Sequence, residues 1–170
     1  MLSLLRLNAV RLDRLVLRSR SDAPAAGAEQ TYSFILSHRD VSVGTSGAEH
    51  AMQLRVWLRP DMPSESPPAI DEMDVLLTGY FTFAERASKE NRARIYPLTA
   101  VAMLFGVARG IVAQTTGLFP TGTFMLPPLD VTGAAKKKRL TGTCTLITSP
   151  ARSDQRTAAI LMQEPVPQKA

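Results

Sequence analysis

The stretch that decides the fold covers residues 95–113 and reads IYPLTAVAMLFGVARGIVA. Proline suits the first turn of a helix because its missing N–H would have no partner there, so Pro97 predicts a helix start. Gly117 suits the left-handed position just past a helix end. Together they predict a helix of about five turns. This helix is apolar on nearly every side, whereas a surface helix of a monomer needs a polar face, so protein or lipid must cover it.

Protein is the expected cover. The uninterrupted apolar part ends at Arg109, well short of the roughly 20 residues that cross a bilayer. Gly106 and Gly110 have the four-residue spacing that lets helices approach closely. We therefore expect close packing at a subunit interface and no membrane insertion. The candidate interface residues are Met103, Gly106, Val107 and Gly110.

Four segments before the helix have the β-branched, aromatic or alternating character of strands. They are residues 5–18, 31–43, 50–59 and 71–84. The proline-rich residues 60–68 cannot join a central strand and form a loop, and Gly79 hints at a bulge. Strands followed by a helix, without β–α alternation, predict an α+β fold: a four-stranded antiparallel sheet with a long buried helix packed on one face.

Further motifs flank the long helix. Tyr96-Pro97 opens it, Leu-Phe-Pro follows at residues 118–120, and the apolar run LPPLDV occupies residues 126–131. The order and spacing of these pieces resemble the carboxy-terminal half of the SecB family of export chaperones. The opening segment, residues 5–17, is similar to the first strand of that family, so the resemblance covers roughly residues 5–131.

The resemblance implies a SecB-like architecture and function. Protomers of that family pair through their sheets, and two dimers sandwich the long helices into a homotetramer. The implied activity is that of a cytoplasmic, ATP-independent holdase chaperone, neither an enzyme nor dependent on a cofactor. Its partners would be unfolded polypeptide clients, either exported preproteins or a dedicated client such as the antitoxin of a toxin–antitoxin system.

A holdase of this kind binds its clients in grooves lined by aromatic, Leu and Met side chains, which bury many sequences without demanding particular hydrogen bonds. The loop after the long helix lines the groove in the family's pattern. For each candidate residue, an ordinary place in the core is the alternative. The candidate client-binding residues are Trp57, Tyr80, Phe83, Phe119, Phe124, Met125, Leu126 and Leu129.

The chain departs from the family pattern after Val131. Residues 132–139 read TGAAKKKR in place of the family's last amphipathic helix, and the acidic, metal-ligating tail that docks on the SecA motor is missing. SecA is therefore not supported as a partner. We divide the chain into a SecB-like domain, residues 1–131, and a basic, partly flexible extension, residues 132–170. Within the extension, residues 141–148 have the character of an added edge strand.

Charge leaves a second interpretation open. The net charge of +5 belongs to the extension, which holds seven Lys and Arg against two carboxylates, whereas residues 1–131 hold thirteen of each sign. The basic run at 136–139 and the arginine-rich first strand would suit a nucleic-acid-associated or assembly protein that uses the same fold. No aromatic residues interleave with the basic run, which disfavours nucleic acid as the partner.

Catalytic chemistry is sparse in the sequence. Cys144, His38 and His50 provide neither an internal disulfide nor a cysteine–histidine metal cluster. The sequence contains no Gly-rich phosphate loop and no Ser/His/Asp ordering. The carboxylates at residues 71–74 fit a solvated strand start better than a metal site, because adjacent strand residues point to opposite faces. These features favour a binding protein over an enzyme.

Overall fold

The structure, a computed structural model, describes most of the chain between residues 4 and 147. The described residues are 4–19, 29–43, 49–60, 68, 70–85, 87–117, 123–126, 128, 130–137 and 139–147. Two of the candidate client-binding residues, Phe119 and Leu129, lie outside them, as does the extension beyond residue 147.

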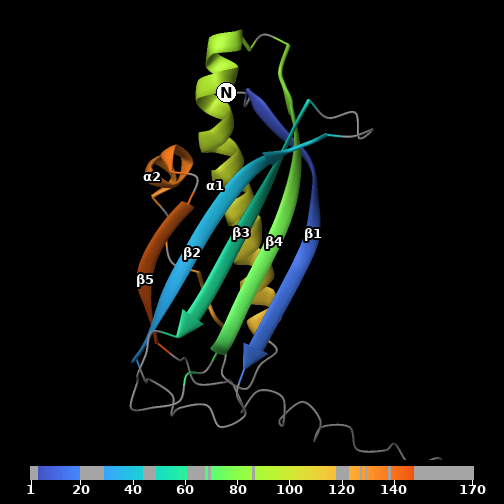
Figure 1. The fold of residues 1–170 in the computed structure, drawn as a ribbon. Helices are drawn as coiled ribbons and strands as arrows, with labels where there is room; N and C mark the ends of the chain where they lie inside the picture. The colour runs from blue at the N-terminus through green and yellow to red at the C-terminus, as the bar shows by residue number, and fades with distance from the viewer. Residues whose placement is uncertain are drawn as a thin grey trace, which may run out of the picture.

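The chain forms an antiparallel sheet with one long helix packed on it, which confirms the α+β class (Figure 1). The sheet contains five strands in the order β1-β4-β3-β2-β5. The strands are β1 (Leu5–Ser19), β2 (Glu29–Val41), β3 (His50–Pro60), β4 (Ile70–Phe83) and β5 (Arg139–Ile147). The helices are α1 (Lys89–Thr116) and α2 (Val131–Lys136).

The sheet therefore has one strand more than the four of the predicted fold. The first four strands follow the predicted segments to within a few residues. The fifth, β5, pairs with β2 at the edge of the sheet, where the sequence suggested an added strand at residues 141–148. Residues assigned to the extension thus contribute to the same sheet, and the short helix α2 stands where the chain departs from the SecB pattern.

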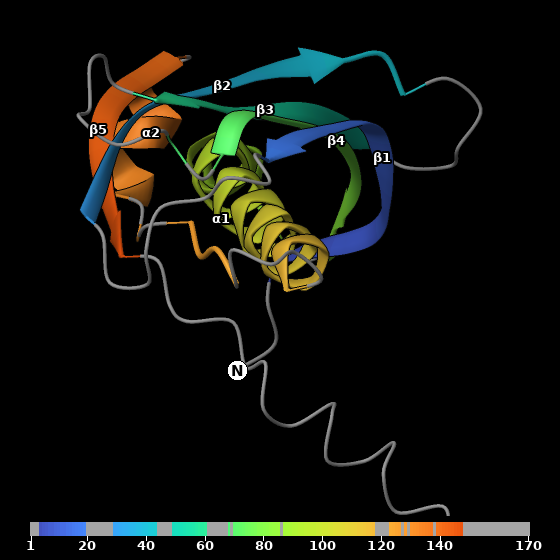
Figure 2. The ribbon, with the colours of Figure 1, turned by 90° about the horizontal axis from the view of Figure 1, so that it is seen from below.

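Strand β3 illustrates why one face of the sheet is covered and the other is not. Met52, Leu54, Val56 and Leu58 are almost completely buried, while the residues between them are partly or fully exposed. Alternate side chains of a strand point to opposite faces, so this pattern places one face against α1 and the other toward solvent. Figure 2 shows the sheet curling around α1, which lies on its concave side.

The curl of the sheet is accompanied by irregular pairing in β1. Its register against β4 shifts between Leu7 and Ala9 and again between Leu12 and Arg14. Bulges of this kind increase twist and bend a strand. The predicted bulge at Gly79 is wrong, since Gly79 pairs regularly with its neighbours on both sides.

Gly79 is required instead for close packing of α1 on the sheet. A Cβ atom at this position would lie 2.6 Å from Cδ2 of Leu104 on α1 and 3.0 Å from the Phe81 ring. Leu104 and Phe81 are both completely buried. Glycine at residue 79 therefore lets the helix approach the sheet closely.

The helix α1 begins earlier than predicted, at Lys89 instead of near Pro97. Ser88 caps it, because its Oγ accepts a hydrogen bond from the Asn91 N–H at 3.3 Å. Pro97 lies inside the helix, where it removes one backbone hydrogen bond. The helix continues through it because packing of the neighbouring residues Tyr96 and Ala100 against the sheet outweighs local propensity.

The end of α1 also differs in detail from the prediction. Gly117 closes the helix in the right-handed region, at φ −59° and ψ −15°, and its N–H bonds to the Ala113 carbonyl at 3.0 Å. The expected left-handed cap is therefore wrong. A Cβ at residue 117 would lie only 3.2 Å from that carbonyl oxygen and 3.4 Å from Oγ1 of Thr123, so glycine serves a close approach.

By length and composition alone, α1 would suffice to cross a membrane. One such helix is weak evidence, because the core helix of a soluble protein passes the same test. In the structure 33% of its most apolar 18-residue window is buried, and eight residues of the whole helix are buried. They are Tyr96, Ala100, Val101, Leu104, Phe105, Ala108, Val112 and Thr116.

Candidate functional site

The side of α1 that points away from the core is apolar and open. We call it the α1 outer face and define it as Leu98, Ala102, Met103, Gly106, Val107 and Gly110. Leu98 is 39% exposed, and Ala102 and both glycines are also exposed. A surface helix face normally carries polar side chains, so this one is suited to cover by another polypeptide.

The four candidate interface residues lie together on this face. Met103, Gly106, Val107 and Gly110 have the helical spacing that places them on one side, and Met103 and Val107 are partly buried. A Cβ atom at Gly106 or at Gly110 would meet no atom within 4 Å. The two glycines therefore leave a smooth, open strip along the helix.

The segment after α1 contains three of the candidate client-binding residues, at 124–126. Met125 is 53% exposed, whereas Phe124 and Leu126 are buried, at 9% and 1%. The Phe124 ring packs edge-on against Tyr32 with the centroids 5.9 Å apart. The Phe124 N–H donates to Oγ1 of Thr116 at 2.8 Å, which ties the segment to the end of α1. Only Met125 presents apolar surface to solvent here.

Trp57 and Tyr80 lie on the opposite, convex face of the sheet and are partly buried. Arg59 lies over the Trp57 ring at 4.0 Å from its centroid, and the indole Nε1 donates to Glu72 at 3.4 Å. The indole is therefore enclosed by charged side chains instead of lining an apolar groove.

Phe83 belongs to an aromatic cluster at the start of α1. The centroid of its ring lies 5.4 Å from that of the His50 ring, and the His50 centroid lies 4.8 Å from that of the Tyr96 ring. Burial raises the pKa of the Tyr96 hydroxyl, and the negative charge of Asp40 adds to the effect. Phe83 is 7% exposed and so forms part of the core.

The described residues thus place the candidate client-binding side chains in three separate regions and do not bring them into one groove. The regions are the end of α1, the convex face of the sheet and the aromatic cluster. Burial could not be read from residue type, because Phe124, Met125 and Leu126 are equally apolar and adjacent. The three residues differ in their contacts with the rest of the fold. Phe124 packs against Tyr32 and bonds to Thr116, and Leu126 is buried, whereas Met125 is exposed to solvent.

Sequence reasoning missed the polar centre of the convex face. Asp74, expected near a solvated strand start, is only 2% exposed. Its carboxylate accepts two hydrogen bonds from Arg55, at 2.7 and 2.9 Å, and lies 3.3 Å from Arg14. A bidentate arginine satisfies a carboxylate that burial would otherwise destabilise. The sequence pattern that could have indicated this ion pair is the set of arginines at outward positions of the first and third strands.

A second carboxylate on this face is held by a network. Asp13 accepts a hydrogen bond from Thr78 and pairs with Arg11 at 2.6 Å. Gln53 donates to Asp13 at 3.1 Å and accepts from Arg39 at 2.9 Å. Partial burial works to raise the pKa of Asp13, but the hydrogen bonds outweigh it and hold that pKa below its ordinary value.

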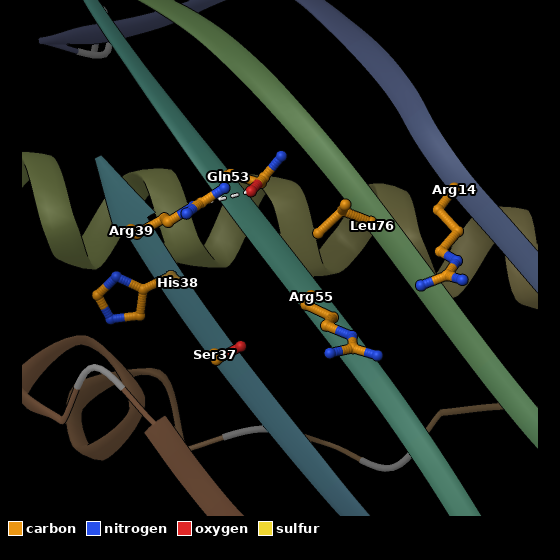
Figure 3. A pocket seen from close by; sticks show the side chains of 7 residues that line it. All are labelled: Arg14, Ser37, His38, Arg39, Gln53, Arg55 and Leu76. Carbon is orange, nitrogen blue, oxygen red and sulfur yellow. Dashed lines mark hydrogen bonds between the residues drawn. The ribbon is translucent and has the colours of Figure 1, made fainter. Parts of the chain in front are cut away.

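Beside these networks lies an open hollow of about 380 Å³ on the convex face (Figure 3). Three arginines, contributed by β1, β2 and β3, surround it. Its lining residues are Arg14, Ser37, His38, Arg39, Gln53, Arg55 and Leu76. Among the described residues, no group of three or more His, Cys, Asp or Glu side chains is placed to hold a metal ion.

Comparison with known proteins identifies the fold. No family model and no curated protein matches the chain. Among solved structures, it is similar to the Mycobacterium tuberculosis Rv1957 SecB-like chaperone in complex with a ChAD peptide from the Rv1956 HigA1 antitoxin. The two superpose with a TM-score of 0.51 over 74% of this chain and 91% of that chain, at 14% sequence identity. The chain has a SecB-like fold, as the sequence predicted, and the likeness is one of fold.

Proposed function

We propose that the protein is an ATP-independent holdase chaperone of the SecB type. The observation that carries the proposal is the SecB-like fold, shared with a chaperone that was solved with an antitoxin peptide. The uncovered α1 outer face and the exposed Met125 support it, because a holdase needs accessible apolar surface. The proposal includes no enzymatic activity and no cofactor, and it places the protein in the cytoplasm.

We further propose that the α1 outer face is buried between copies of the chain, in a tetramer formed as a dimer of dimers. Gly106 and Gly110 give a second helix room to approach, and all six residues that define the face are apolar, although the partly exposed Thr99 and Arg109 lie on the same side of the helix. Without such cover, Leu98 and its neighbours would remain in water, at a loss of roughly 25 cal/mol for each Å² of apolar surface left exposed.

The assembly is tested by replacing Gly106 with leucine. Within one protomer this change is tolerated, because no atom beyond the adjacent helix backbone lies within 4 Å of the new Cβ. At a helix–helix contact the larger side chain would overpack the interface. The free energy of association would become less favourable by about 1–3 kcal/mol, which weakens association roughly 5- to 150-fold. Ala93→Leu, an exposed α1 position outside the outer face, is the matched control. Light scattering that gives a stable wild-type monomer at micromolar concentration would contradict this part of the proposal.

Clients are proposed to bind around the segment at 123–126, with Met125 as the principal contact. A methionine side chain is flexible and polarizable, and so adapts to many partner sequences. Phe124 and Leu126 are buried in the core and so anchor the segment to the rest of the fold. The proposed site is therefore narrower than the set of residues predicted from the sequence, and it leaves out Trp57, Tyr80 and Phe83.

The client site is tested by a pair of adjacent substitutions. Met125→Ser removes a side chain that is about half exposed. Because a client could no longer bury this side chain, binding of an unfolded polypeptide should be weaker by about 1–1.5 kcal/mol, or roughly five- to twelvefold. Its melting temperature should equal that of the wild type. Leu126→Ser is the contrasting control, since truncating a buried leucine lowers stability by about 2–5 kcal/mol. Unchanged client affinity in a folded Met125→Ser variant would exclude this segment as the site.

We propose that the protein has one dedicated client, such as an antitoxin, and does not serve exported preproteins in general. The solved SecB-like chaperone is in complex with an antitoxin peptide, and residues 132–170 of the present chain hold seven Lys and Arg against two carboxylates, a charge opposite to that of an acidic tail that docks on SecA. Co-purification with the product of an adjacent toxin–antitoxin pair would support the dedicated client. Equal binding of many unrelated unfolded proteins would favour a general holdase.

A further inference from the structure

The convex face of the sheet, opposite α1, is strongly enriched in arginine. Strand alternation and register place eight arginines there, and the five strands contain no lysine. Together we call these residues the arginine face. They are Arg6, Arg11, Arg14, Arg18, Arg39, Arg55, Arg59 and Arg139.

The carboxylates of this face are outnumbered and already engaged. Those among the described side chains are Asp13, Glu72 and Asp74. Asp13 pairs with Arg11, Asp74 with Arg14 and Arg55, and Glu72 with Arg18 at 3.5 Å. The face therefore has fewer acceptors than donors.

Four arginines of the face have no carboxylate partner among the described residues. They are Arg6, Arg39, Arg59 and Arg139. Arg39 donates only to the neutral amide of Gln53, and Arg59 lies over the Trp57 ring. Each guanidinium carries five N–H donors in a planar fork that fits a carboxylate bidentately, which makes such a surface complementary to acidic groups.

We propose that the arginine face is a docking surface for an acidic, Asp- or Glu-rich segment of a partner protein, centred on the hollow between Arg14 and Arg39. These two residues lie on strands separated by β4 and β3, so their backbones are roughly 14 Å apart. An extended peptide rises about 3.3 Å per residue, so carboxylates four positions apart reach both. The surface is separate from the client segment, because it lies on the other side of the sheet from α1.

The geometry favours an acidic peptide over nucleic acid. A surface for single strands needs free aromatic rings on which bases stack. Trp57 and Tyr80 are the aromatic residues of this face, and the Trp57 ring is covered by Arg59 at 4.0 Å and is fixed by Glu72, so Tyr80 alone is left and cannot stack successive bases. Asp13, Glu72 and Asp74 stand among the arginines and would repel the closely spaced phosphates of a duplex, whereas a peptide presents its carboxylates singly.

The test uses a fluorescein-labelled peptide of alternating Glu and Ser, with a Gln-Ser peptide and a DNA duplex as comparisons. Fluorescence anisotropy should give binding of the Glu peptide that weakens as salt rises from roughly 50 to 300 mM, because exposed charges are screened. Arg14→Gln with Arg39→Gln should weaken that binding about fivefold or more. Both side chains are largely exposed, so the fold should persist, and the single variant Arg39→Glu serves if the double variant does not fold.

The matched control removes the same charge elsewhere. Lys89→Gln with Arg94→Gln alters two exposed residues at the start of α1 and should leave peptide affinity within about twofold, since screening confines surface charge effects to short range. An equal loss in this control, or equal binding of the Gln-Ser peptide, would overturn the proposal. Tighter binding of the duplex than of the Glu peptide, abolished by the Arg14 and Arg39 changes, would also overturn it and identify a nucleic-acid surface.

Discussion

Replacing Gly79 with alanine tests how closely α1 packs on the sheet. The added Cβ would lie 2.6 Å from Cδ2 of Leu104, whereas ordinary carbon contacts are about 3.5–4.0 Å. Relief requires a shift of roughly 1 Å in a buried leucine, and overpacking of this kind destabilises by about 1–3 kcal/mol. Alanine regains about 0.5–1 kcal/mol over glycine inside a strand, which leaves a net loss of roughly 0.5–2 kcal/mol.

The loss is measured as the change in free energy of unfolding in urea, in a double-mutant cycle with Leu104→Ala. Removing the leucine side chain takes away the clashing atom, so Gly79→Ala should no longer destabilise in that background, with a coupling energy of about 0.5–3 kcal/mol. Additive effects of the two changes, or a Gly79→Ala protein more stable than the wild type, would refute the close helix–sheet contact.

Three further perturbations follow from local contacts. Arg55→Gln should lower stability by about 1.5–3 kcal/mol in urea titrations, because the nearly buried Asp74 carboxylate loses its bidentate donor; a change below about 0.5 kcal/mol would contradict it. Ser88→Ala should lower the free energy of unfolding by about 1 kcal/mol, because α1 loses the capping hydrogen bond from the Asn91 N–H to Ser88 Oγ. Unchanged stability would mean that α1 does not depend on this cap. The pKa of Asp13 is depressed in the folded state, so its contribution is present above the ordinary value of 3.8 and is lost as pH falls through the lower folded value. Asp13→Asn should therefore flatten the stability profile at acidic pH, and an unchanged acid limb would contradict the network.

Local patterns predicted the elements of the fold because the signals for them are local. The alternation of residues 50–59 and the apolar run after Pro97 depend on neighbours in sequence, and both elements are present. The start of α1 was missed since a serine cap at residue 88 and tertiary packing outweigh the proline preference for a first turn. Gly79 was misread for a related reason, because its role depends on Leu104, twenty-five residues away in sequence.

The candidate site was less accessible to sequence reasoning. Whether an apolar side chain lines a groove or fills the core depends on which elements cover it, and Met125 and Leu126 differ in this respect although they are adjacent. The arginine face depends on strand order, which brings β1 and β3 to either side of β4. The arginines are visible in the sequence, whereas the placement of Asp74 on the strand between them is visible only in the structure.

The most direct test of the holdase proposal is suppression of aggregation without nucleotide. A chemically unfolded protein is diluted into buffer that contains the purified chain and a chelator, and light scattering is followed with and without ATP. Suppression is expected at near-stoichiometric ratios and to the same extent in all conditions, because capture depends on burial of apolar surface alone. Absence of suppression, or suppression only with ATP or a metal ion, would contradict it.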